Sequence, residues 1–347
     1  MRLNFCTLFN SNYLSRGLVL YESLLKHSPD FHLYVFAFDD VCFEFLKKQN
    51  YSNLTVISLK EFEDEKLLNV KSTRSMAEYC WTCTPSTILY CITKHNLDNC
   101  TYIDADMLFV SNPQVLIEEM GNKSVLITEH RYTKEYEQSK LAGKYCVQFV
   151  TIKATEAGLK VCNWWREACL DWCYARYEDG KFGDQKYLDD WTTRFEGVHE
   201  LQHLGGGIAP WNVQQYDFSF ENNEIVGKET STGKIFKAVF FHFHSLKFYK
   251  EDLVSLTDSG YTLSNNVIET FFKPYVKLLS KAKNDILKLD NTMNCDGANN
   301  IAPYNVMSFK TIFQYYLEGI KSSKKNVLGH NLLKKVKHHY YYKVSNL

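Results

Sequence analysis

The sequence has no net charge, no long apolar run and no internal repeat. Lys+Arg and Asp+Glu number 40 each in 347 residues, so the composition does not indicate a nucleic-acid partner. No apolar stretch reaches the roughly 18 residues that a membrane span needs. The first residues, Met1 to Phe5, lack a charged and apolar leader. We therefore expect a cytoplasmic protein that does not bind nucleic acid.

The sequence also lacks a regular cysteine framework. Its eleven cysteines are an odd number and their spacing is irregular. Disulfide-stapled domains carry an even number of cysteines at ordered spacings, and such domains occur in oxidising compartments. We therefore predict that these residues are reduced thiols, most of them buried.

What the chain does contain is an alternation of apolar strand-like and amphipathic helix-like segments. Strands are predicted at 3–9, 31–38, 54–59, 101–106, 125–128, 147–152 and 238–244, and helices at 41–49, 84–94, 155–176 and 267–289. This order is typical of an α/β fold with a mainly parallel sheet and helices on both faces. In such sheets ligands bind beyond the carboxyl ends of the strands, where Asn10, Asp39 and Asp104 fall. The expected domains are 1–275 and a helical, basic extension, 276–347.

The most informative stretch runs from Thr101 to Pro113. It is an apolar segment that contains Asp104 and Asp106, separated by the small residue Ala105. If the backbone is extended there, side chains two residues apart point to the same side, so the two carboxylates converge. Two neighbouring carboxylates suit a hard divalent cation such as Mg²⁺ or Mn²⁺.

Two later segments carry polar residues that fit the same site. Asp184 and Gln185 open a helix-like segment, where Asp184 is either a cap or a ligand. His242 and His244 lie two residues apart at the end of a predicted strand, with Lys247 beyond them. Two imidazoles on one face followed by a cation fit a metal and phosphate site.

Taken in order, these motifs resemble those of GT-A fold glycosyltransferases, most closely family 8, the relatives of glycogenin and of bacterial lipopolysaccharide galactosyl- and glucosyltransferases. The resemblance covers roughly residues 2 to 275 and rests on the following residues: Asn10, Tyr13, Asp104, Asp106, Asn112, Pro113, Asp184, Gln185, His242 and Lys247. It implies a GT-A fold and a retaining transfer of a hexose from a UDP-sugar to a glycan or glycolipid acceptor.

The resemblance also implies a role for each matched residue. Asp104 and Asp106 bind Mn²⁺ or Mg²⁺ together with a late histidine, either His242, the first choice, or His244. The residues expected to contact the nucleotide-sugar are Thr7, Asn10, Tyr13, Asp39, Arg74, Asp104, Gln148 and Lys247. Among them Arg74 stands in for a basic residue of the preceding helix, and Gln148 lies where the family has an Asn-x-Gly segment. Asp184 holds the donor sugar and Gln185 lies beside the anomeric carbon.

Two other function classes fit part of the pattern. A haloacid-dehalogenase-like phosphatase also uses a strand that ends in two Asp residues with Mg²⁺, but the pair there lies near the start of its domain. A non-catalytic nucleotide-sugar-binding protein could have the same fold. Hydrolysis of a UDP-sugar with Mn²⁺, compared with hydrolysis of a phosphomonoester, distinguishes these classes.

The last segment of the chain, 321–347, carries seven lysines and no acidic residue. Leucine and tyrosine side chains lie among these lysines, as in a segment that rests on an anionic membrane surface. We therefore expect peripheral membrane attachment and a lipid-linked saccharide, such as a lipopolysaccharide precursor, as one acceptor class.

Overall fold

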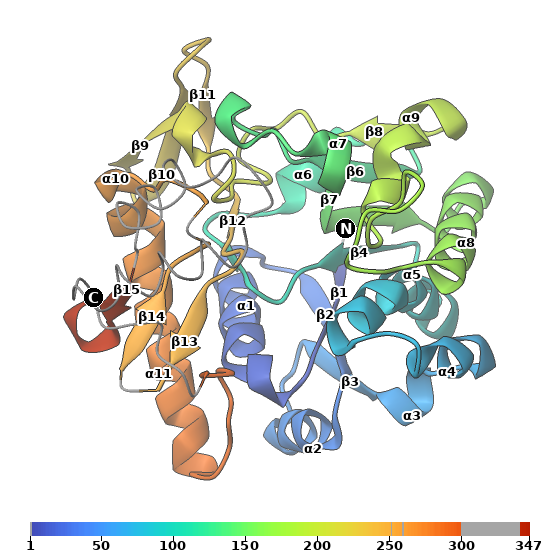
Figure 1. Ribbon diagram of the computed structural model, residues 1–347, viewed down its shortest axis with the longest axis horizontal. Coiled ribbons are helices and arrows are strands. Elements are labelled where there is room, and N and C mark those ends of the chain that lie inside the picture. Colours follow the sequence, from blue (N-terminus) through green and yellow to red (C-terminus); the bar gives the residue numbers. More distant parts are fainter. Residues whose placement is uncertain (1, 251, 259, 300–340) are drawn as a thin grey trace, which may run out of the picture.

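A seven-stranded sheet forms the centre of the molecule, with helices on both faces (Figure 1). The computed structural model describes residues 2–250, 252–258, 260–299 and 341–347. The strand order is β3-β2-β1-β4-β7-β6-β8, and within this sheet β7 runs antiparallel to both of its neighbours while the others are parallel. The strands are β1 (Leu3–Phe9), β2 (Phe31–Ala37), β3 (Leu54–Ser58), β4 (Asn99–Ile103), β6 (Val125–Glu129), β7 (Tyr145–Lys153) and β8 (Val198–Glu200). The predicted α/β class is confirmed.

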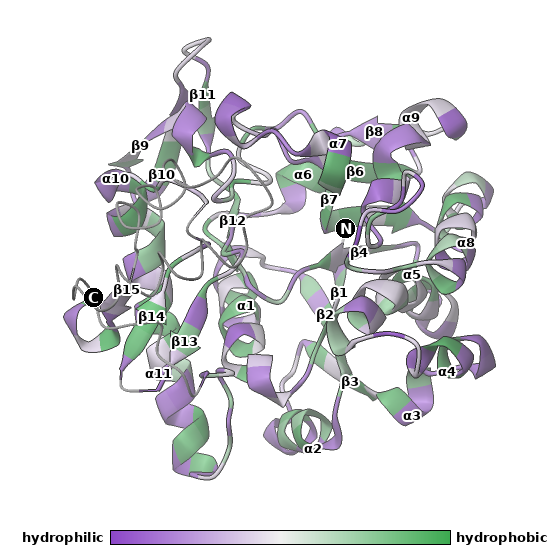
Figure 2. Ribbon diagram, in the orientation of Figure 1, coloured by the Kyte–Doolittle hydropathy of each residue, from purple (hydrophilic) through white to green (hydrophobic). Residues whose placement is uncertain are grey.

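The two faces of this sheet have separate apolar cores. In β1, Phe5 and Phe9 pack into a core shared with α1 and α2, whereas Cys6 and Leu8 pack on the opposite side with α5 and α8. Strand β1 is buried along its whole length and five of its seven residues are apolar, which is why it was recognisable in the sequence (Figure 2). The helices of this part are α1 (Leu14–His27), α2 (Asp40–Gln49), α3 (Leu59–Phe62), α4 (Glu65–Lys71), α5 (Met76–His95), α6 (Gln114–Glu119), α7 (Ser139–Ala142), α8 (Glu156–Asp171) and α9 (Trp191–Arg194).

Three smaller sheets and a long helix pack beside the central sheet. Strand β5 pairs antiparallel with β12, β9 to β11 form a meander, and β14 lies between β13 and β15. These elements are β5 (Met107–Phe109), β9 (Tyr216–Glu221), β10 (Glu224–Glu229), β11 (Ile235–Lys237), β12 (Phe240–His242), β13 (Lys247–Tyr249), β14 (Leu253–Ser255), β15 (Tyr341–Lys343), α10 (Asn265–Val267), a π-helical turn (Ile268–Phe272) and α11 (Lys273–Leu289).

The predicted domain boundary after residue 275 falls inside α11. Val276 and Leu279 of this helix are buried in one apolar cluster with Val19 of α1, so the helix is part of the main body of the protein. The basic segment 321–347 lies outside the described residues except for 341–347. Among the described helices, none combines the length and the apolar character needed to cross a bilayer.

Helix α5 begins eight residues earlier than the predicted start at residue 84. Ser75 accepts a hydrogen bond from the Glu78 backbone N–H, and the Glu78 carboxylate accepts one from the Ser75 N–H, which forms a capping box. Pro85 therefore lies in the helix interior, where the sequence alone favours a helix start. Helix α8 ends at Asp171, although its pattern predicted helix to residue 176.

Asp39, predicted to contact the nucleotide, caps a helix in the structure. Its carboxylate accepts hydrogen bonds from the Cys42 backbone N–H at the start of α2, at 2.7 Å, and from the Ser11 N–H and hydroxyl. An N-cap of this kind stabilises a protein by about 1 kcal/mol.

We expect Asp39→Ala to lower the free energy of unfolding by at least about 1 kcal/mol and to leave nucleotide binding intact. Asp39→Asn, which can still cap the helix, should be nearly as stable as the unmodified protein. Chemical denaturation and calorimetry with UDP measure the two quantities. Normal stability combined with loss of UDP binding would instead make Asp39 a nucleotide ligand.

Candidate active site

Asp104 and Asp106 lie in a turn at the carboxyl end of β4, not on one face of a continuous strand. Strand β4 ends at Ile103 and β5 begins at Met107, so the strand that was predicted to end in the two acids stops just before Asp104. The convergence predicted from strand alternation is nevertheless present, because the turn points both carboxylates to the same side. Tyr102 donates a hydrogen bond from its hydroxyl to Asp104 Oδ1 at 3.0 Å.

His242 completes a group of three metal-ligating side chains with these acids. Strand β12 pairs with β5 so that His242 lies opposite Met107, and this places the imidazole beside the turn. Its Nε2 lies 3.2 Å from Asp106 Oδ1 and 3.7 Å from Asp104 Oδ2. The ligand atoms of the three residues all lie within 4.8 Å of one another. Two carboxylates and an imidazole fit Mn²⁺ or Mg²⁺ with room for further oxygen ligands.

Gln148 lies behind His242 and fixes its orientation. Gln148 is fully buried on β7, and its Oε1 lies 2.8 Å from His242 Nδ1. An amide oxygen only accepts hydrogen bonds, so Nδ1 carries the proton and Nε2 faces the two carboxylates. A hydrogen bond to the far nitrogen is the usual way in which proteins orient a metal-binding histidine. Gln148 was predicted to contact the nucleotide-sugar; in the structure it contacts a metal-ligating side chain.

The three groups stabilise one another electrostatically. Burial opposes ionisation of Asp106, but the charge of His242 and its hydrogen bond outweigh burial and lower the pKa of Asp106 to about 2. Burial also favours neutral His242, yet the Asp106 charge raises the pKa of His242 well above its usual value. For Asp104, burial dominates and raises the pKa. His242 therefore partly compensates the charge of the two acids, which is a role that a divalent cation performs more completely.

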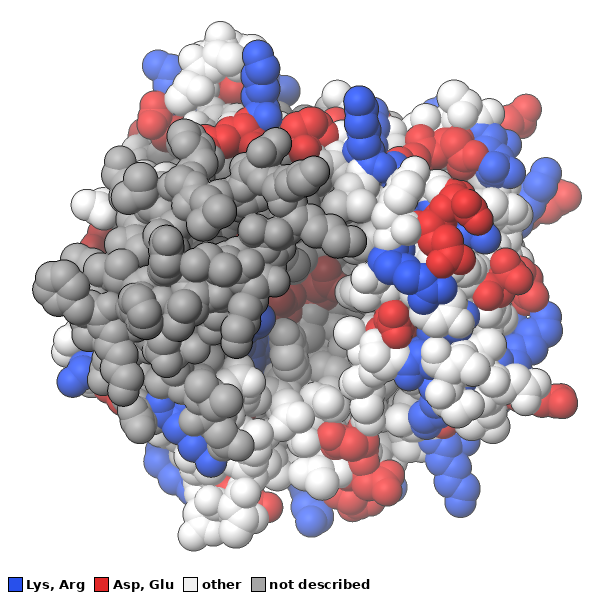
Figure 3. Space-filling model, in the orientation of Figure 1, with Lys and Arg blue, Asp and Glu red and all other residues white. Residues whose placement is uncertain are grey.

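The group formed by Asp104, Asp106 and His242 lines a cavity of about 690 Å³. Figure 3 shows a hollow in the corresponding face of the molecule, with acidic atoms inside it. Among the described residues that line this cavity there is no Lys or Arg, and the acidic ones are Asp104, Asp106 and Asp184. The aromatic residues in its lining are Phe9, Tyr13, Trp81, Tyr102, Tyr132, Phe182, Trp211 and Tyr261. A divalent cation held by the acids would attract negative charge to this place.

Asp184 and Gln185 line the cavity and belong to a turn before a 3-10 helix. Gly183 permits this turn because its φ is +53°. The backbone is held in place by Trp165, which donates from Nε1 to the Asp184 carbonyl at 2.9 Å. Burial, followed by the charge of Asp104, raises the pKa of Asp184 to about 7. The side chain does not cap a helix, so the alternative interpretation as an N-cap is not supported.

Trp211 and His130 are cavity residues that the sequence did not single out as ligands. Trp211 donates from Nε1 to the His130 carbonyl at 2.9 Å, and its ring lies edge-on to His242 and to His244. Tyr132 stacks on His130 with the ring centroids 4.5 Å apart. The contacts of Trp211 join segments far apart in the sequence, so no local pattern could have predicted them.

His244, the alternative metal ligand, lines the cavity but lies outside the group of three. Burial, reinforced by the charge of His242, lowers the pKa of His244 to about 4. The structure therefore distinguishes the two histidines geometrically, with His242 beside the carboxylates. Asn10 and Tyr13 also line the cavity as the resemblance implied, and Arg16 lies over the Tyr13 ring at 4.4 Å from its centroid.

Besides Asp39 and Gln148, three predicted contacts do not line this cavity. Thr7 is fully buried within β1. The guanidinium of Arg74 lies 3.9 Å from the Tyr174 ring centroid and donates to the Leu170 carbonyl, so it is held against the segment that follows α8. Lys247 is exposed on β13.

Together the fold and the site define an α/β protein with a candidate metal centre at the carboxyl edge of its central sheet. No family model matches the chain. The uncharacterized protein YfnF of Bacillus subtilis (strain 168) is 32% identical over 248 residues, which is 69% of this chain and 80% of YfnF. The uncharacterized protein YfnD of the same organism is 26% identical over 285 residues, which is 80% of this chain and 89% of YfnD. The chain belongs to the family of YfnF.

A similar solved structure is the galactosyltransferase LgtC in complex with donor and acceptor sugar analogues. It aligns with a TM-score of 0.48 and 11% identity, over 80% of this chain and 96% of that chain. A likeness at this level does not establish an activity, which has to follow from the site itself.

We expect Gln148→Leu to weaken Mn²⁺ binding by about 10- to 100-fold, the usual effect of losing the partner that orients a metal-binding histidine. Thr151→Val, a buried substitution on the same strand, is the matched control and should bind Mn²⁺ normally. Isothermal titration with Mn²⁺ measures both affinities, and circular dichroism checks the fold. Unchanged affinity in Gln148→Leu would show that His242 is oriented by other contacts.

Proposed function

We propose that this protein is a metal-dependent, retaining glycosyltransferase that moves a hexose from a UDP-sugar to a saccharide or lipid-linked saccharide acceptor. The observation that carries the proposal is the group formed by Asp104, Asp106 and His242 at the base of an aromatic cavity. A nucleotide-sugar combines a diphosphate, which needs a divalent cation, with a base and a sugar, which pack well on aromatic rings.

In this proposal the charge of the leaving group determines the role of the cation. When the glycosidic bond breaks, negative charge develops on the diphosphate oxygen that leaves. Mn²⁺ or Mg²⁺ would stabilise that charge as a Lewis acid. The carboxylates of Asp104 and Asp106 and Nε2 of His242 would hold the cation, and Gln148 would keep His242 in the required orientation.

The reacting sugar would lie against Asp184 and Gln185. Asp184 accepts hydrogen bonds from donor sugar hydroxyls, and Gln185, whose Nε2 donates to the Ala142 carbonyl, lies beside the anomeric carbon. An amide is a weak nucleophile, so we favour attack by the acceptor hydroxyl on the face that the diphosphate leaves. The bond from the anomeric carbon to the diphosphate breaks, the bond to the acceptor oxygen forms, and the acceptor proton passes to the departing diphosphate. This course retains the configuration.

The uridine and the acceptor would occupy opposite parts of the cavity. Tyr13 and Asn10 lie at the carboxyl end of β1, where the base would bind. Tyr132, Trp211 and Tyr261 line the cavity near His244, and rings of this kind stack on the apolar faces of sugars. The acceptor is proposed to bind against these rings. A lipid-linked acceptor and peripheral membrane attachment rest on the lysine-rich segment 321–347 alone.

We expect release of UDP from one or more members of a panel of UDP-sugars when Mn²⁺ is present, and no hydrolysis of a phosphomonoester. Asp106→Asn should abolish this release, because an amide binds a divalent cation much more weakly than a carboxylate. Asp217→Asn, which removes an exposed acid on β9, is the matched control. Phosphomonoester hydrolysis would favour the phosphatase alternative. UDP-sugar binding without release, with acceptor saccharides supplied, would favour a binding protein.

A second prediction separates the sugar from the nucleotide. Asp184→Ala should lower turnover at least about 100-fold while UDP affinity with Mn²⁺ changes little, because the proposed partner of Asp184 is the sugar. Asp190→Ala removes an acid from the same segment that pairs with Arg194 and does not line the cavity, so it should behave normally. Equal losses of turnover and UDP affinity in Asp184→Ala would mark a structural role.

A further inference from the structure

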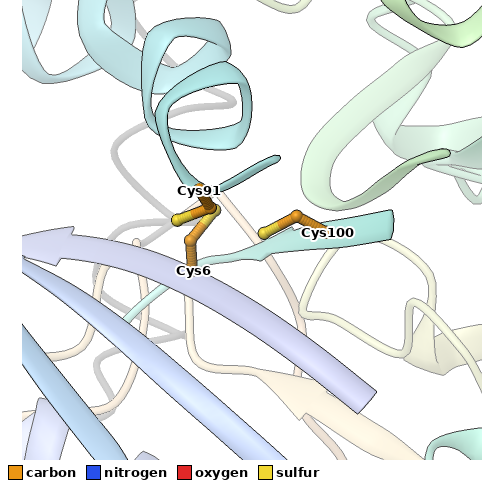
Figure 4. A group of neighbouring side chains, drawn as sticks. All are labelled: Cys6, Cys91 and Cys100. Carbon is orange, nitrogen blue, oxygen red and sulfur yellow. The ribbon is translucent and has the colours of Figure 1, made fainter. Parts of the chain in front are cut away.

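Three cysteine thiols meet in the core between the central sheet and α5. They come from β1, α5 and β4, respectively Cys6, Cys91 and Cys100, and they lie side by side (Figure 4). Their sulfur atoms are all within 4.8 Å of one another, and each residue is completely buried. Three sulfur ligands at about 2.3 Å from a central ion would be about 4.0 Å apart. The arrangement therefore has to contract by less than 1 Å to hold an ion.

The ligand atoms select the kind of cation. Sulfur is soft, so hard ions such as Mg²⁺ and Mn²⁺ are disfavoured here. Structural Zn²⁺ sites are four-coordinate, whereas the described residues supply three metal-ligating side chains at this place. The Thr87 hydroxyl lies 3.5 Å from Cys6 Sγ. Cu(I) is a soft ion, and it matches three sulfur ligands.

We propose that Cys6, Cys91 and Cys100 form a binding site for Cu(I). The copper stays in the cuprous state, each thiol that binds it releases its proton to solvent, and no electron is transferred. Bound copper links β1, β4 and α5, so it stabilises the layer whose strands end just before Asn10 and Asp104. This site is distinct from the group of Asp104, Asp106 and His242, because sulfur ligands prefer soft ions and carboxylate oxygens prefer hard ions. The proposal does not depend on the proposed function.

The test is a competition titration of the full-length protein with Cu(I) under anaerobic conditions, against a chromophoric Cu(I) chelator. The site is buried, so overnight equilibration allows for local opening. We expect one Cu(I) per chain to be retained and the melting temperature to rise. Cys91→Ala should bind Cu(I) at least about tenfold more weakly, because even loss of a supporting contact costs that much at a metal site. Cys169→Ala removes another buried thiol that lies beside a cysteine and should bind normally.

X-ray absorption of the copper-loaded, unmodified protein provides a readout that does not depend on how the variants fold. Three sulfur atoms at about 2.3 Å from copper would support the proposal. Oxygen or nitrogen ligands, absence of retained copper, or equal weakening in Cys91→Ala and Cys169→Ala would overturn it.

Discussion

The candidate active site depends on keeping two like-charged carboxylates together in a mostly buried place. Asp104 and Asp106 repel each other and both lose hydration, so the turn that holds them needs compensation from the surrounding structure. Antiparallel pairing of β5 with β12 supplies it, because this pairing brings His242 within 3.2 Å of Asp106. The reversed strand β7 then places Gln148 behind the imidazole. The two-stranded sheet therefore places the charge of His242 at the site, and the central sheet places the side chain that orients His242.

Much of the fold was predictable because the central strands are buried on both faces. Strands β1 and β2 are mostly apolar segments, and they were located to within one residue. The start of α5 was not predicted, since the helix was placed from residue 84 and the capping box lies earlier, at Ser75. The predicted domain boundary after residue 275 falls inside α11, which packs on α1, and a contact between such distant segments cannot be recognised from local composition.

The residues of the site could be predicted where two of them lie close together in the sequence. The two acids and the paired histidines were found from neighbours in sequence, although the acids converge through a turn. Arg74 and Lys247 were chosen by their order along the chain, and order alone does not say which way a side chain points. Trp211 was not identified as a cavity residue, because its position follows from hydrogen bonding of its indole to His130 on a remote segment.

On the proposed function, the charge of the cavity couples metal binding to recognition of the donor sugar. The described lining residues include three acids and no Lys or Arg, and a divalent cation held by Asp104 and Asp106 would offset the charge of a diphosphate. Burial and the charge of Asp104 raise the pKa of Asp184 to about 7, which leaves much of it protonated at neutral pH. A cation beside Asp104 counters that charge and thereby favours ionised Asp184. On this proposal, the ion that binds the diphosphate would also favour the form of Asp184 that accepts hydrogen bonds from sugar hydroxyls.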